Sequence, residues 1–517
     1  MKNAILAITF FIGITLNAQN YVVDPTFGTN GKVVTDFNIG NGNNQVPQNC
    51  FYLNGKYIFV QKNQISAVNY DGSADLTFGI SGCVRLTDAT LKYTILNSKV
   101  IDNFIYLSGL KANTAGSVNF AFVARLSADG IFDTSFGVGG IAVFSTGAVA
   151  IIPNSTNDNG VMDFVVKDGA IYTTGSVSVT GTAFTKIFVA KLSLSGTVDT
   201  AFDALGYKIY SICQNNKTKG IFSYENDLLL AISGRSIFSQ AAQTQTLKGL
   251  IKIDGDGNFV TGFGTGGVKI IDVCTGCNAS GESINKITLT GNFLYMLTTH
   301  SEAAPWNWRK LQRINIATTE TENIANTSYS EGDYLVDNDK IYILGCDNSN
   351  SETTQCPYDF NLSRRNLNGT LDTTFNLTGR FSLNFESAPN SNDKGSVLIK
   401  HPDGRIMMGG YTYGAITTAP HTGFAIARIV DELLQTDNFN MQHYFSVAPN
   451  PVENTLNVNN AKNEAIESIS ISDASGKIVY ESNTGETAIN VERLDGGMYF
   501  MKINSRDKTA ILKFIKK

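Results

Sequence analysis

A short phrase of residues recurs along the chain and constrains its fold more than any other feature. The fullest copy runs from Asp129-Gly130 to Phe136-Gly137, with an Asp-Gly turn, an Asp at 133 and a Phe six residues after the turn Gly. The other copies pair a turn Gly with a Phe at the same spacing: Gly72 and Phe78, Gly196 and Phe202, Gly257 and Phe263, Gly369 and Phe375. Such repetition predicts one supersecondary unit that stacks on its neighbours because it cannot bury its apolar face alone.

Two further signals recur between the copies. Apolar runs flank an Asn-Gly or Asp-Gly pair in residues 52–59, 165–172 and 400–407. These turn residues tolerate the positive φ angles of a tight β-hairpin. Weaker versions bring the number of predicted hairpins to seven, at residues 102–103, 225–226, 291–292 and 338–339. A strand that leads into the phrase, as in residues 122–126 and 424–429, also occurs seven times.

The spacing of the phrases predicts the architecture. A half-copy at residues 24–28 precedes the first full phrase, and the gap between Phe263 and Phe375 holds an extra hairpin and strand, so it spans two units. A unit of roughly 58 residues with about four short strands has the size of one propeller blade. We therefore predict an all-β chain with a seven-bladed β-propeller over residues 19–434; an open stack of the same units is the alternative. The Phe should pack between blades, and the Asp should accept N–H groups in its turn.

The pattern D-x-x-F-G-x-G-G, followed by the hairpin and an A-R-L-type strand, resembles the delta-60 repeat of bacterial secreted proteins. The resemblance covers most of residues 20–434, clearly in five units and weakly around Asn323 to Asn326, where the Phe is missing. It implies a propeller blade and no particular activity.

The N-terminus predicts export. A lysine in Met1-Lys2-Asn3 precedes an apolar run over residues 4–16, and Asn17-Ala18 supplies a small residue for cleavage. This is the pattern of a signal peptide over residues 1–18, cleaved between Ala18 and Gln19. No later stretch reaches about 18 uninterrupted apolar residues, so we expect no transmembrane helix in the mature chain. The net charge of -5 gives no basic footprint for nucleic acid.

The last part of the chain changes character. A polar linker is expected over residues 435–443, followed over residues 444–517 by short alternating strands that predict a small immunoglobulin-like β-sandwich. This segment resembles the type A C-terminal sorting domain of the type IX secretion system. The matching residues are Pro449, Asn450, Pro451, Asp473, Gly476, Lys477, Leu494, Gly496, Gly497, Met498, Tyr499 and the basic end. The resemblance implies a bacterium of the Bacteroidota and export by the Sec translocon through the periplasm. It also implies recognition by the type IX outer-membrane translocon, with release or attachment at the cell surface.

Seven cysteines in an exported chain suggest disulfides, with at least one thiol left over. Cys346 and Cys356 flank a polar loop between two predicted neighbouring strands, which suits a disulfide across a hairpin. Cys274 and Cys277 form a C-x-x-C. A zinc site needs about four ligands and no second such pair exists, so a local disulfide is the preferred interpretation.

The sequence offers no established catalytic motif. The acidic residues 254–258 lack the Gly and Glu of a calcium loop, and the four histidines show no metal-binding spacing. We predict no catalytic residue, no metal and no cofactor. Trp306 and Trp308, the two tryptophans of the chain, could present a flat apolar platform to a sugar. The alternative is that they cap the core of the unit whose Phe is missing.

Three functions remain open. The first is a non-catalytic binding propeller, released or displayed on the cell surface, for a glycan or another surface molecule. The second is a secreted polysaccharide-degrading enzyme with carboxylates at the mouth of the propeller. The third is a structural spacer.

Overall fold

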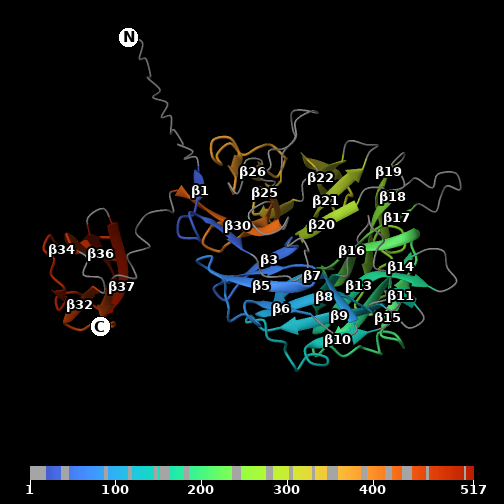
Figure 1. Cartoon of the computed structure of the whole chain (residues 1–517), viewed down its shortest axis with the longest axis horizontal. Coiled ribbons are helices and arrows are strands. Elements are labelled where there is room, and N and C mark those ends of the chain that lie inside the picture. The colour runs from blue at the N-terminus through green and yellow to red at the C-terminus, as the bar shows by residue number, and fades with distance from the viewer. Residues whose placement is uncertain are drawn as a thin grey trace, which may run out of the picture. The chain divides into compact units, whose positions relative to one another are not determined.

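The computed structural model contains β-strands and no α-helix in the residues it describes (Figure 1). The described ranges are 19–35, 46–86, 91–113, 119–144, 149–151, 163–179, 185–235, 246–274, 283–301, 307–328, 332–345, 359–385, 393–413, 422–432, 445–460, 465–474, 476–505 and 508–517. The chain divides into two compact units, Met1–Ile429 and Val430–Lys517. None of the described segments forms a helix suited to crossing a membrane.

The first unit is built from short strands. In chain order they are β1 (Tyr21–Val23), β2 (Lys32–Thr35), β3 (Asn49–Leu53), β4 (Lys56–Val60), β5 (Gln64–Asn69), β6 (Cys83–Arg85), β7 (Leu91–Ile101), β8 (Phe104–Asn113), β9 (Asn119–Leu126), β10 (Ile141–Phe144), β11 (Val149–Ile151), β12 (Asp163–Lys167), β13 (Ala170–Val179), β14 (Thr185–Ser193), β15 (Tyr207–Tyr210), β16 (Gln214–Tyr224), β17 (Asp227–Arg235), β18 (Thr246–Ile253), β19 (Val268–Cys274), β20 (Ser283–Thr290), β21 (Phe293–Ser301), β22 (Asn307–Asn315), β23 (Thr321–Ser328), β24 (Asp333–Asp337), β25 (Lys340–Leu344), β26 (Phe360–Asn366), β27 (Arg380–Leu383), β28 (Lys394–Lys400), β29 (Ile406–Tyr413) and β30 (Thr422–Asp431).

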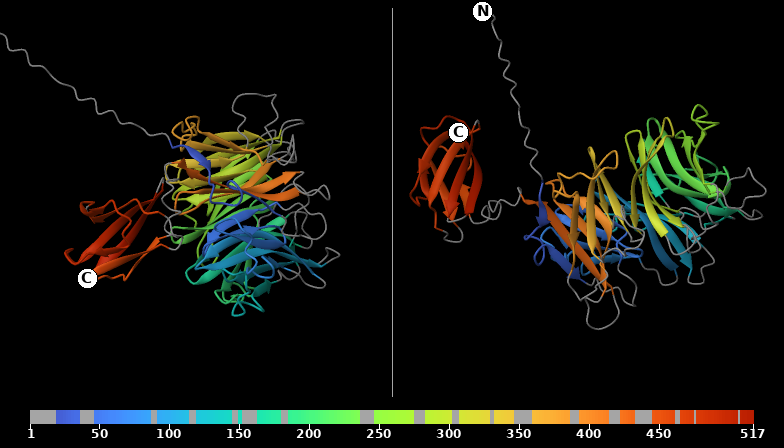
Figure 2. Two further views of the ribbon diagram at one scale, coloured as in Figure 1. Left: turned by 60° about the vertical axis from the view of Figure 1, so that its left-hand side comes forward. Right: turned by 90° about the horizontal axis from the view of Figure 1, so that it is seen from above.

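These strands form seven small antiparallel sheets within the described residues (Figure 2). Six of the sheets are continuous in sequence: β3–β6, β7–β10, β11–β15, β16–β19, β20–β23 and β24–β27. All seven predicted hairpins are confirmed, because the first two long strands of every sheet pair around the predicted turn. Asn54 and Asp168, at two of these turns, have φ angles of 48° and 50°, the left-handed conformation that such turns require.

The seventh sheet combines the two ends of the unit. Strands β28, β29 and β30 come from its C-terminal part, and β2 supplies a further strand beside β30. The pairing is antiparallel and runs from Lys32 opposite Ala427 to Thr35 opposite Phe424. The half-phrase at residues 24–28 therefore directly precedes β2. In the same way, each full phrase directly precedes the last strand of its own sheet.

The phrase forms a tight turn between the third and fourth strands. In its fullest copy, Asp133 Oδ1 accepts the Ser135 N–H at 3.0 Å and its hydroxyl at 2.7 Å. The same bonds occur in three other copies, between Asp24 and Thr26, Asp75 and Thr77, and Asp372 and Thr374. The expected role of the Asp is confirmed: it satisfies the N–H groups of its own turn.

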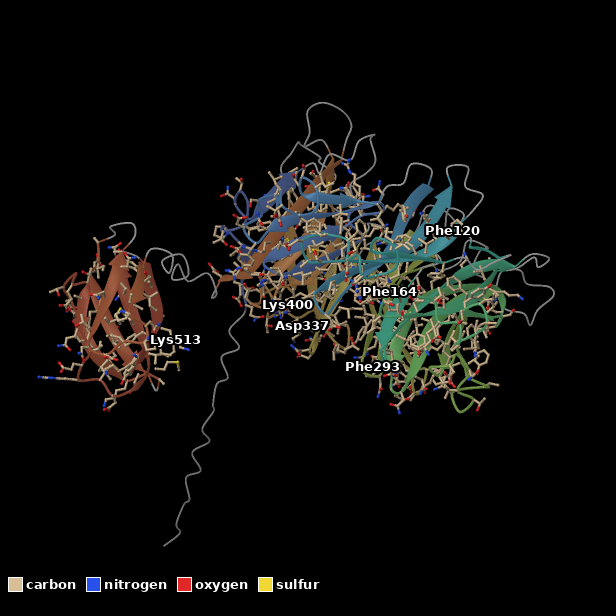
Figure 3. The ribbon with its side chains drawn as sticks, turned by 90° about the horizontal axis from the view of Figure 1, so that it is seen from below. Phe120, Phe164, Phe293, Asp337, Lys400 and Lys513 are labelled. Carbon is tan, nitrogen blue, oxygen red and sulfur yellow. The ribbon has the colours of Figure 1, made fainter. Side chains whose placement is uncertain are left out.

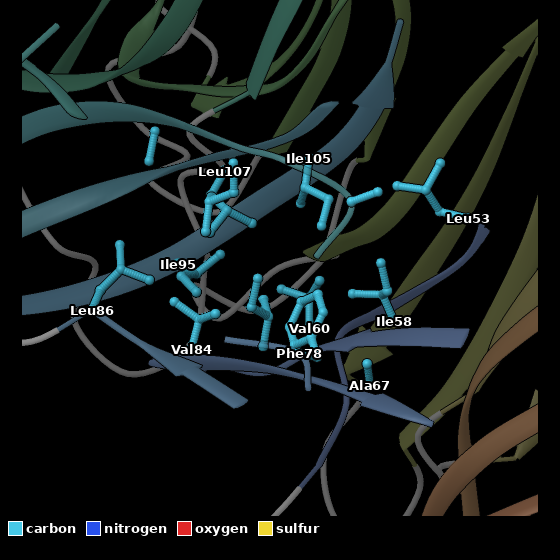
Figure 4. Packing of buried hydrophobic residues seen from close by; sticks show 14 of the residues in the cluster. Leu53, Ile58, Val60, Ala67, Phe78, Val84, Leu86, Ile95, Ile105 and Leu107 are labelled. Carbon is cyan, nitrogen blue, oxygen red and sulfur yellow. The ribbon is translucent and has the colours of Figure 1, made fainter. Parts of the chain in front are cut away.

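The phrase also joins neighbouring sheets, as at the junction between β3–β6 and β7–β10. Phe78 is fully buried, and a Cβ added to Gly130 in the following sheet would lie 2.9 Å from its ring. Beside it, the Gly79 N–H donates to the Asp129 carbonyl at 2.9 Å. Around Phe78, buried residues of β3–β6 pack against those of β7 and β8 (Figure 4). The turn Gly is thus required for space as well as for its φ of 75°.

One copy departs from the expected anchor. Phe263 is only partly buried, with Lys269 Nζ at 4.7 Å from its ring centre. The next sheet, β20–β23, has no phrase and so offers no turn Gly to this ring. The same missing phrase affects Gly369, the turn Gly of the sheet that follows β20–β23. With no Phe ring to contact in β20–β23, Gly369 packs against the backbone of Ile324.

In the second unit, the residues that the structure describes form two antiparallel sheets. One contains β31 (Phe445–Ala448), β32 (Thr455–Asn460) and β35 (Ala488–Asn490); the other contains β33 (Ser468–Asp473), β34 (Ile478–Ser482), β36 (Gly497–Ser505) and β37 (Lys508–Lys516). The inward residues of the two sheets share one core, with Leu456 and Ile489 on one side and Met501 and Phe514 on the other. This is a two-layer β arrangement.

Candidate functional site

Most of the small-molecule and disulfide candidates lie outside the described residues. For Trp308 and Cys274 the structure gives only the strand backbone: Trp308 lies in β22 opposite His300 of β21. The predicted site residues that lie outside the described residues are Trp306, Cys277, Cys346 and Cys356, together with Ala18 of the predicted cleavage site. Gln19 is described, and its backbone hydrogen-bonds with Thr374 and Asn376. The described thiols of Cys50, Cys83 and Cys213 are free. Sugar stacking and disulfide pairing therefore stay predictions.

The repeated strand before the phrase carries a cation that sequence reasoning missed. Arg125 in β9 lies with Nε 2.8 Å from Asp133 Oδ2 and with its guanidinium carbon 4.9 Å from the centre of the Phe136 ring. One terminal nitrogen donates to Ser135 Oγ at 3.0 Å, and the other reaches the Leu194 carbonyl of the next sheet at 2.8 Å. The planar guanidinium thus ties carboxylate, ring and neighbouring sheet together.

Two other arginines repeat this arrangement. Arg364 Nε lies 2.8 Å from Asp372 Oδ2, and its guanidinium carbon is 5.0 Å from the centre of the Phe375 ring. Arg428 in β30 stands over Phe27 at 4.8 Å. The A-R-L-type pattern of the sequence signalled Arg125 and Arg428, but not Arg364, which stands between Ser363 and Arg365.

A connected group of ionisable side chains lies where the two ends of the first unit meet. Asp24 Oδ2 accepts from Arg428 Nε at 2.7 Å and from Arg405 Nε at 2.8 Å. Burial alone would raise the pKa of Asp24, but the hydrogen bond from Thr26 and the two arginines outweigh it and lower that pKa. Arg428 itself is fully buried. We name this group the seam.

The seam continues to a partly exposed carboxylate. Asp403 accepts from Tyr70 Oη at 2.7 Å and from Arg405 at 2.7 Å, and it lies 2.6 Å from His401 Nδ1. Burial opposes ionisation of Asp403, but these hydrogen bonds prevail and its pKa is lowered to about 2. Burial, reinforced by the bond to Asp403, raises the pKa of Tyr70 to about 12. The group is therefore a compensated ionic network rather than a poised acid and base.

A second polar network joins the first strands of successive sheets. Asp163 of β12 accepts from Asn97 of β7 at 2.7 Å and from the Ile221 N–H of β16 at 2.9 Å. Lys99 Nζ lies 2.7 Å from the same carboxylate. One carboxylate therefore links three sheets.

Asp333 repeats this design in another part of the unit. It pairs with Lys286 of β20 and accepts the Leu398 N–H of β28 at 2.8 Å. Near the other end of β24, Lys400 pairs with Asp337 (Figure 3). The sequence contained a signal for these positions: Asn49, Asp163 and Asp333 each stand five residues before a hairpin turn.

In the second unit, the sorting-motif residues converge on the last strand. The Pro449-Asn450-Pro451 segment lies beside β37: Asn450 Oδ1 accepts the Ile515 N–H at 2.9 Å, and its amide donates to the Lys513 carbonyl at 3.3 Å. Val452 donates to the Ile515 carbonyl at 2.8 Å and accepts the Lys517 N–H at 2.9 Å. Residues 449–452 therefore bind the edge of β37 that does not pair with β36.

The other edge of β37 pairs with β36. Gly497 lies opposite Lys516, and the Tyr499 ring stacks on Phe514 at 5.6 Å between centres. The Tyr499 hydroxyl donates to the Asp495 carbonyl at 2.9 Å, which fixes the entry to β36. A Cβ added to Gly496 would lie 3.5 Å from the Lys517 backbone, an ordinary van der Waals contact, so packing at this point does not require glycine.

The remaining motif residues form a hairpin turn between β33 and β34. Gly476 has a φ of 85°, and its N–H donates to the Asp473 carbonyl at 3.0 Å. Lys477 donates its N–H to Asp473 Oδ1 at 3.0 Å. The sorting motif is thus a set of residues that shape this domain and present its last strand. No group of three His, Cys, Asp or Glu side chains suited to a metal ion occurs in the part of the chain that the structure describes.

Comparison with known proteins assigns the second unit. Residues 446–517 match the family described as the secretion system C-terminal sorting domain. The match confirms the type IX sorting domain at the C-terminus. It implies export to the cell surface or to the medium, and interaction with the type IX secretion machinery. No curated protein sequence matches the chain.

Solved structures give only distant similarity. A prolyl endopeptidase is 8% identical with a TM-score of 0.36; the match covers 90% of this chain and 60% of that protein's length. Drosophila Semaphorin 2a is 10% identical with a TM-score of 0.41, covering 92% of this chain and 97% of that one. The polysaccharide lyase Uly1 is 12% identical with a TM-score of 0.41, covering 76% and 91%. At TM-scores below 0.5 these similarities support no conclusion about function.

Proposed function

We propose that the first unit, over residues 19–434, is a seven-bladed β-propeller of the delta-60 repeat type that binds a surface ligand without catalysing a reaction. Residues 444–517, of immunoglobulin-like topology, then serve as its export tail. A signal peptide cleaved after Ala18 starts the route through the periplasm in a bacterium of the Bacteroidota. The match of residues 446–517 to the sorting domain carries this proposal, because it supports export to the cell surface or to the medium, where a surface ligand would be met.

The sheet arrangement supports a closed ring. The described residues of the first unit form seven antiparallel sheets of four or five strands, and in the sheet that contains β30 the N-terminal part of the unit supplies β2 beside it. Propellers join their ends in this way, which leaves only short sheet edges exposed. The seam adds side-chain bonds to the same junction.

The state of the carboxylates supports binding rather than hydrolysis. Glycoside cleavage needs two carboxyl groups that face a substrate, one of them held protonated. The buried carboxylates of Asp24, Asp163 and Asp333 are each held by a cation and by a backbone or hydroxyl donor. The pKa values of Asp24, Asp75, Asp133 and Asp372 are all lowered by hydrogen bonds and cations, against the effect of burial. These groups build the scaffold.

The binding proposal is tested with the purified mature chain on an array of surface polysaccharides and glycoproteins. We expect saturable retention on at least one ligand class, with no release of new reducing ends or unsaturated sugars. The paired change Trp306→Ala and Trp308→Ala should weaken retention, whereas Phe259→Ala, at a partly exposed aromatic residue, should not. Turnover of a polysaccharide would establish an enzyme instead. Absence of any ligand together with ordered self-assembly in solution scattering would favour a spacer.

A further inference from the structure

The two outward faces of the C-terminal domain differ in chemistry. The outward residues of the three-stranded sheet are small or polar and exposed: Ser446, Ala448, Thr455, Asn457, Asn459, Ala488 and Asn490. This is an ordinary solvated surface. The four-stranded sheet instead carries large side chains on the outward positions of β36 and β37.

The register of these two strands defines that surface. Tyr499, Met501, Ile503, Ala510 and Phe514 point into the core. Because successive residues of a strand alternate between faces, the residues between them point outward. We call them the apolar-basic face, which consists of Met498 opposite Ile515, Phe500 opposite Lys513, and Lys502 opposite Ile511.

This face is exposed in the domain. Met498 is 39% exposed, and Ile511 and Ile515 are each 44% exposed. Lys502 and Lys513 are also exposed, and Lys513 extends from the edge of the ribbon (Figure 3). Neither ammonium group pairs with a carboxylate among the described residues of the domain, whose ion pair joins Lys517 to Glu453. Clustered exposed apolar side chains mark interaction sites.

We propose that the apolar-basic face is the surface by which the tail docks onto a component of the type IX secretion machinery. The inference rests on the proposed role of residues 444–517 as the export tail. Because Lys502 and Lys513 pair with no carboxylate in the described part of the domain, we expect the partner surface to carry carboxylates around an apolar strip. Opposite charges at the rim of an interface steer and orient docking. Met498, Ile511 and Ile515 supply the apolar area that such contacts bury.

The placement of the sorting motif agrees with this assignment. The face is formed by the two strands that the Pro449–Pro451 segment and the Gly496–Tyr499 segment hold in place. Met498 belongs to both the motif and the face; the other motif residues shape the domain, while the apolar-basic face meets the partner.

The test is an export assay of the full chain in a bacterium with a type IX system. The amounts of the protein in the medium and on the cell surface are measured against the amount retained inside. Lys502→Ser with Lys513→Ser removes two positive charges; the matched control, Asn457→Asp with Asn459→Asp, changes the net charge equally on the other face. We expect at least a tenfold fall in exported protein for the lysine variant and less than a twofold change for the control. A second variant, Ile511→Ser with Ile515→Ser, should match the lysine variant.

Deletion of residues 446–517 separates the two hypotheses. If the truncated chain is still exported, the tail is not the export signal. If it is retained while both face variants are exported normally, only the docking inference is overturned. The melting temperatures of the purified variants show whether the fold is intact; a variant that melts early is replaced by Lys502→Gln with Lys513→Gln.

Crosslinking identifies the occupant. Benzoylphenylalanine at position 515 of the full chain should crosslink in cells to a protein of the secretion machinery, and at position 459 it should not. Crosslinks from position 515 only to lipid, or to a second copy of the chain, would overturn the proposal. Dimers of the purified chain that Met498→Ser dissociates would do the same.

Discussion

The Arg428 guanidinium lies 2.7 Å from the Asp24 carboxylate across 404 residues of sequence. Asp24 belongs to the half-phrase that opens the described chain, and Arg428 belongs to β30, the last long strand of the first unit. Arg428 also donates to Thr26 Oγ1 at 3.0 Å and to the Tyr70 carbonyl of the next sheet. The two ends of the unit are therefore joined by the same contacts that join neighbouring sheets elsewhere.

Removing the charge of Asp24 should destabilise this junction. Asp24→Asn leaves the buried Arg428 without its counter-charge, and breaking a buried ion pair typically costs about 3–5 kcal/mol. Urea unfolding of the mature chain measures the change. Asp168→Asn is the control: this aspartate is exposed and should cost less than about 1 kcal/mol. Equal effects of the two changes would show that the seam does not stabilise the junction between the two ends of the unit.

The turn glycines should differ in their tolerance of a side chain. Gly130 and Gly139 both have positive φ, 75° and 61°, but only Gly130 lies against the Phe78 ring. Gly139→Ala should cost about 1–2 kcal/mol for its backbone conformation alone. Gly130→Ala should cost a further 1–3 kcal/mol, roughly, because the added methyl group overpacks the junction. Thermal and urea unfolding of both variants check the difference, and similar losses would argue against packing between sheets.

Acid should weaken the first unit over a defined pH range. The folded-state pKa of Asp403 is about 2, below its value near 3.9 in an unfolded chain. The unfolded state therefore binds more protons between these values, and stability rises with pH there. The contribution is complete above about pH 5 and is lost as the pH falls towards 2.

Variants at the seam test this assignment. Asp403→Asn should flatten the dependence of the unfolding free energy on pH between about 4 and 2. Tyr70→Phe, which removes one hydrogen-bond donor to Asp403, should flatten it partly. Urea titrations at a series of pH values measure both slopes. If the slope of unfolding free energy against pH is unchanged in Asp403→Asn, Asp403 does not contribute to acid unfolding.

The repeat was readable from the sequence because it is local. Asp133 and Ser135 are two residues apart, and the φ angles of Asn54 and Asp168 follow from turn chemistry within a hairpin. The seven hairpins and the role of the phrase Asp could therefore be predicted without knowing what surrounds them.

Contacts between repeats were harder to predict. The link from Arg125 to the Leu194 carbonyl and the link from Asp163 to the Ile221 N–H depend on how two sheets approach each other. The exposure of Phe263 likewise depends on the next unit, which lacks a phrase. The sorting motif marked the domain, but the structure was needed to show that Asn450 holds β37, that Tyr499 fixes the entry to β36 and that Gly476 forms the turn between β33 and β34. Met498 is the one motif residue that also lies on the exposed face.

Export of the chain without its tail tests the central claim most directly. Full-length protein and a form that lacks residues 446–517 are expressed in a bacterium with a type IX system, and the medium, cell surface and cell interior are assayed for each. We expect the full chain outside the cell and the truncated, folded chain retained within it. Equal export of both forms would contradict the account.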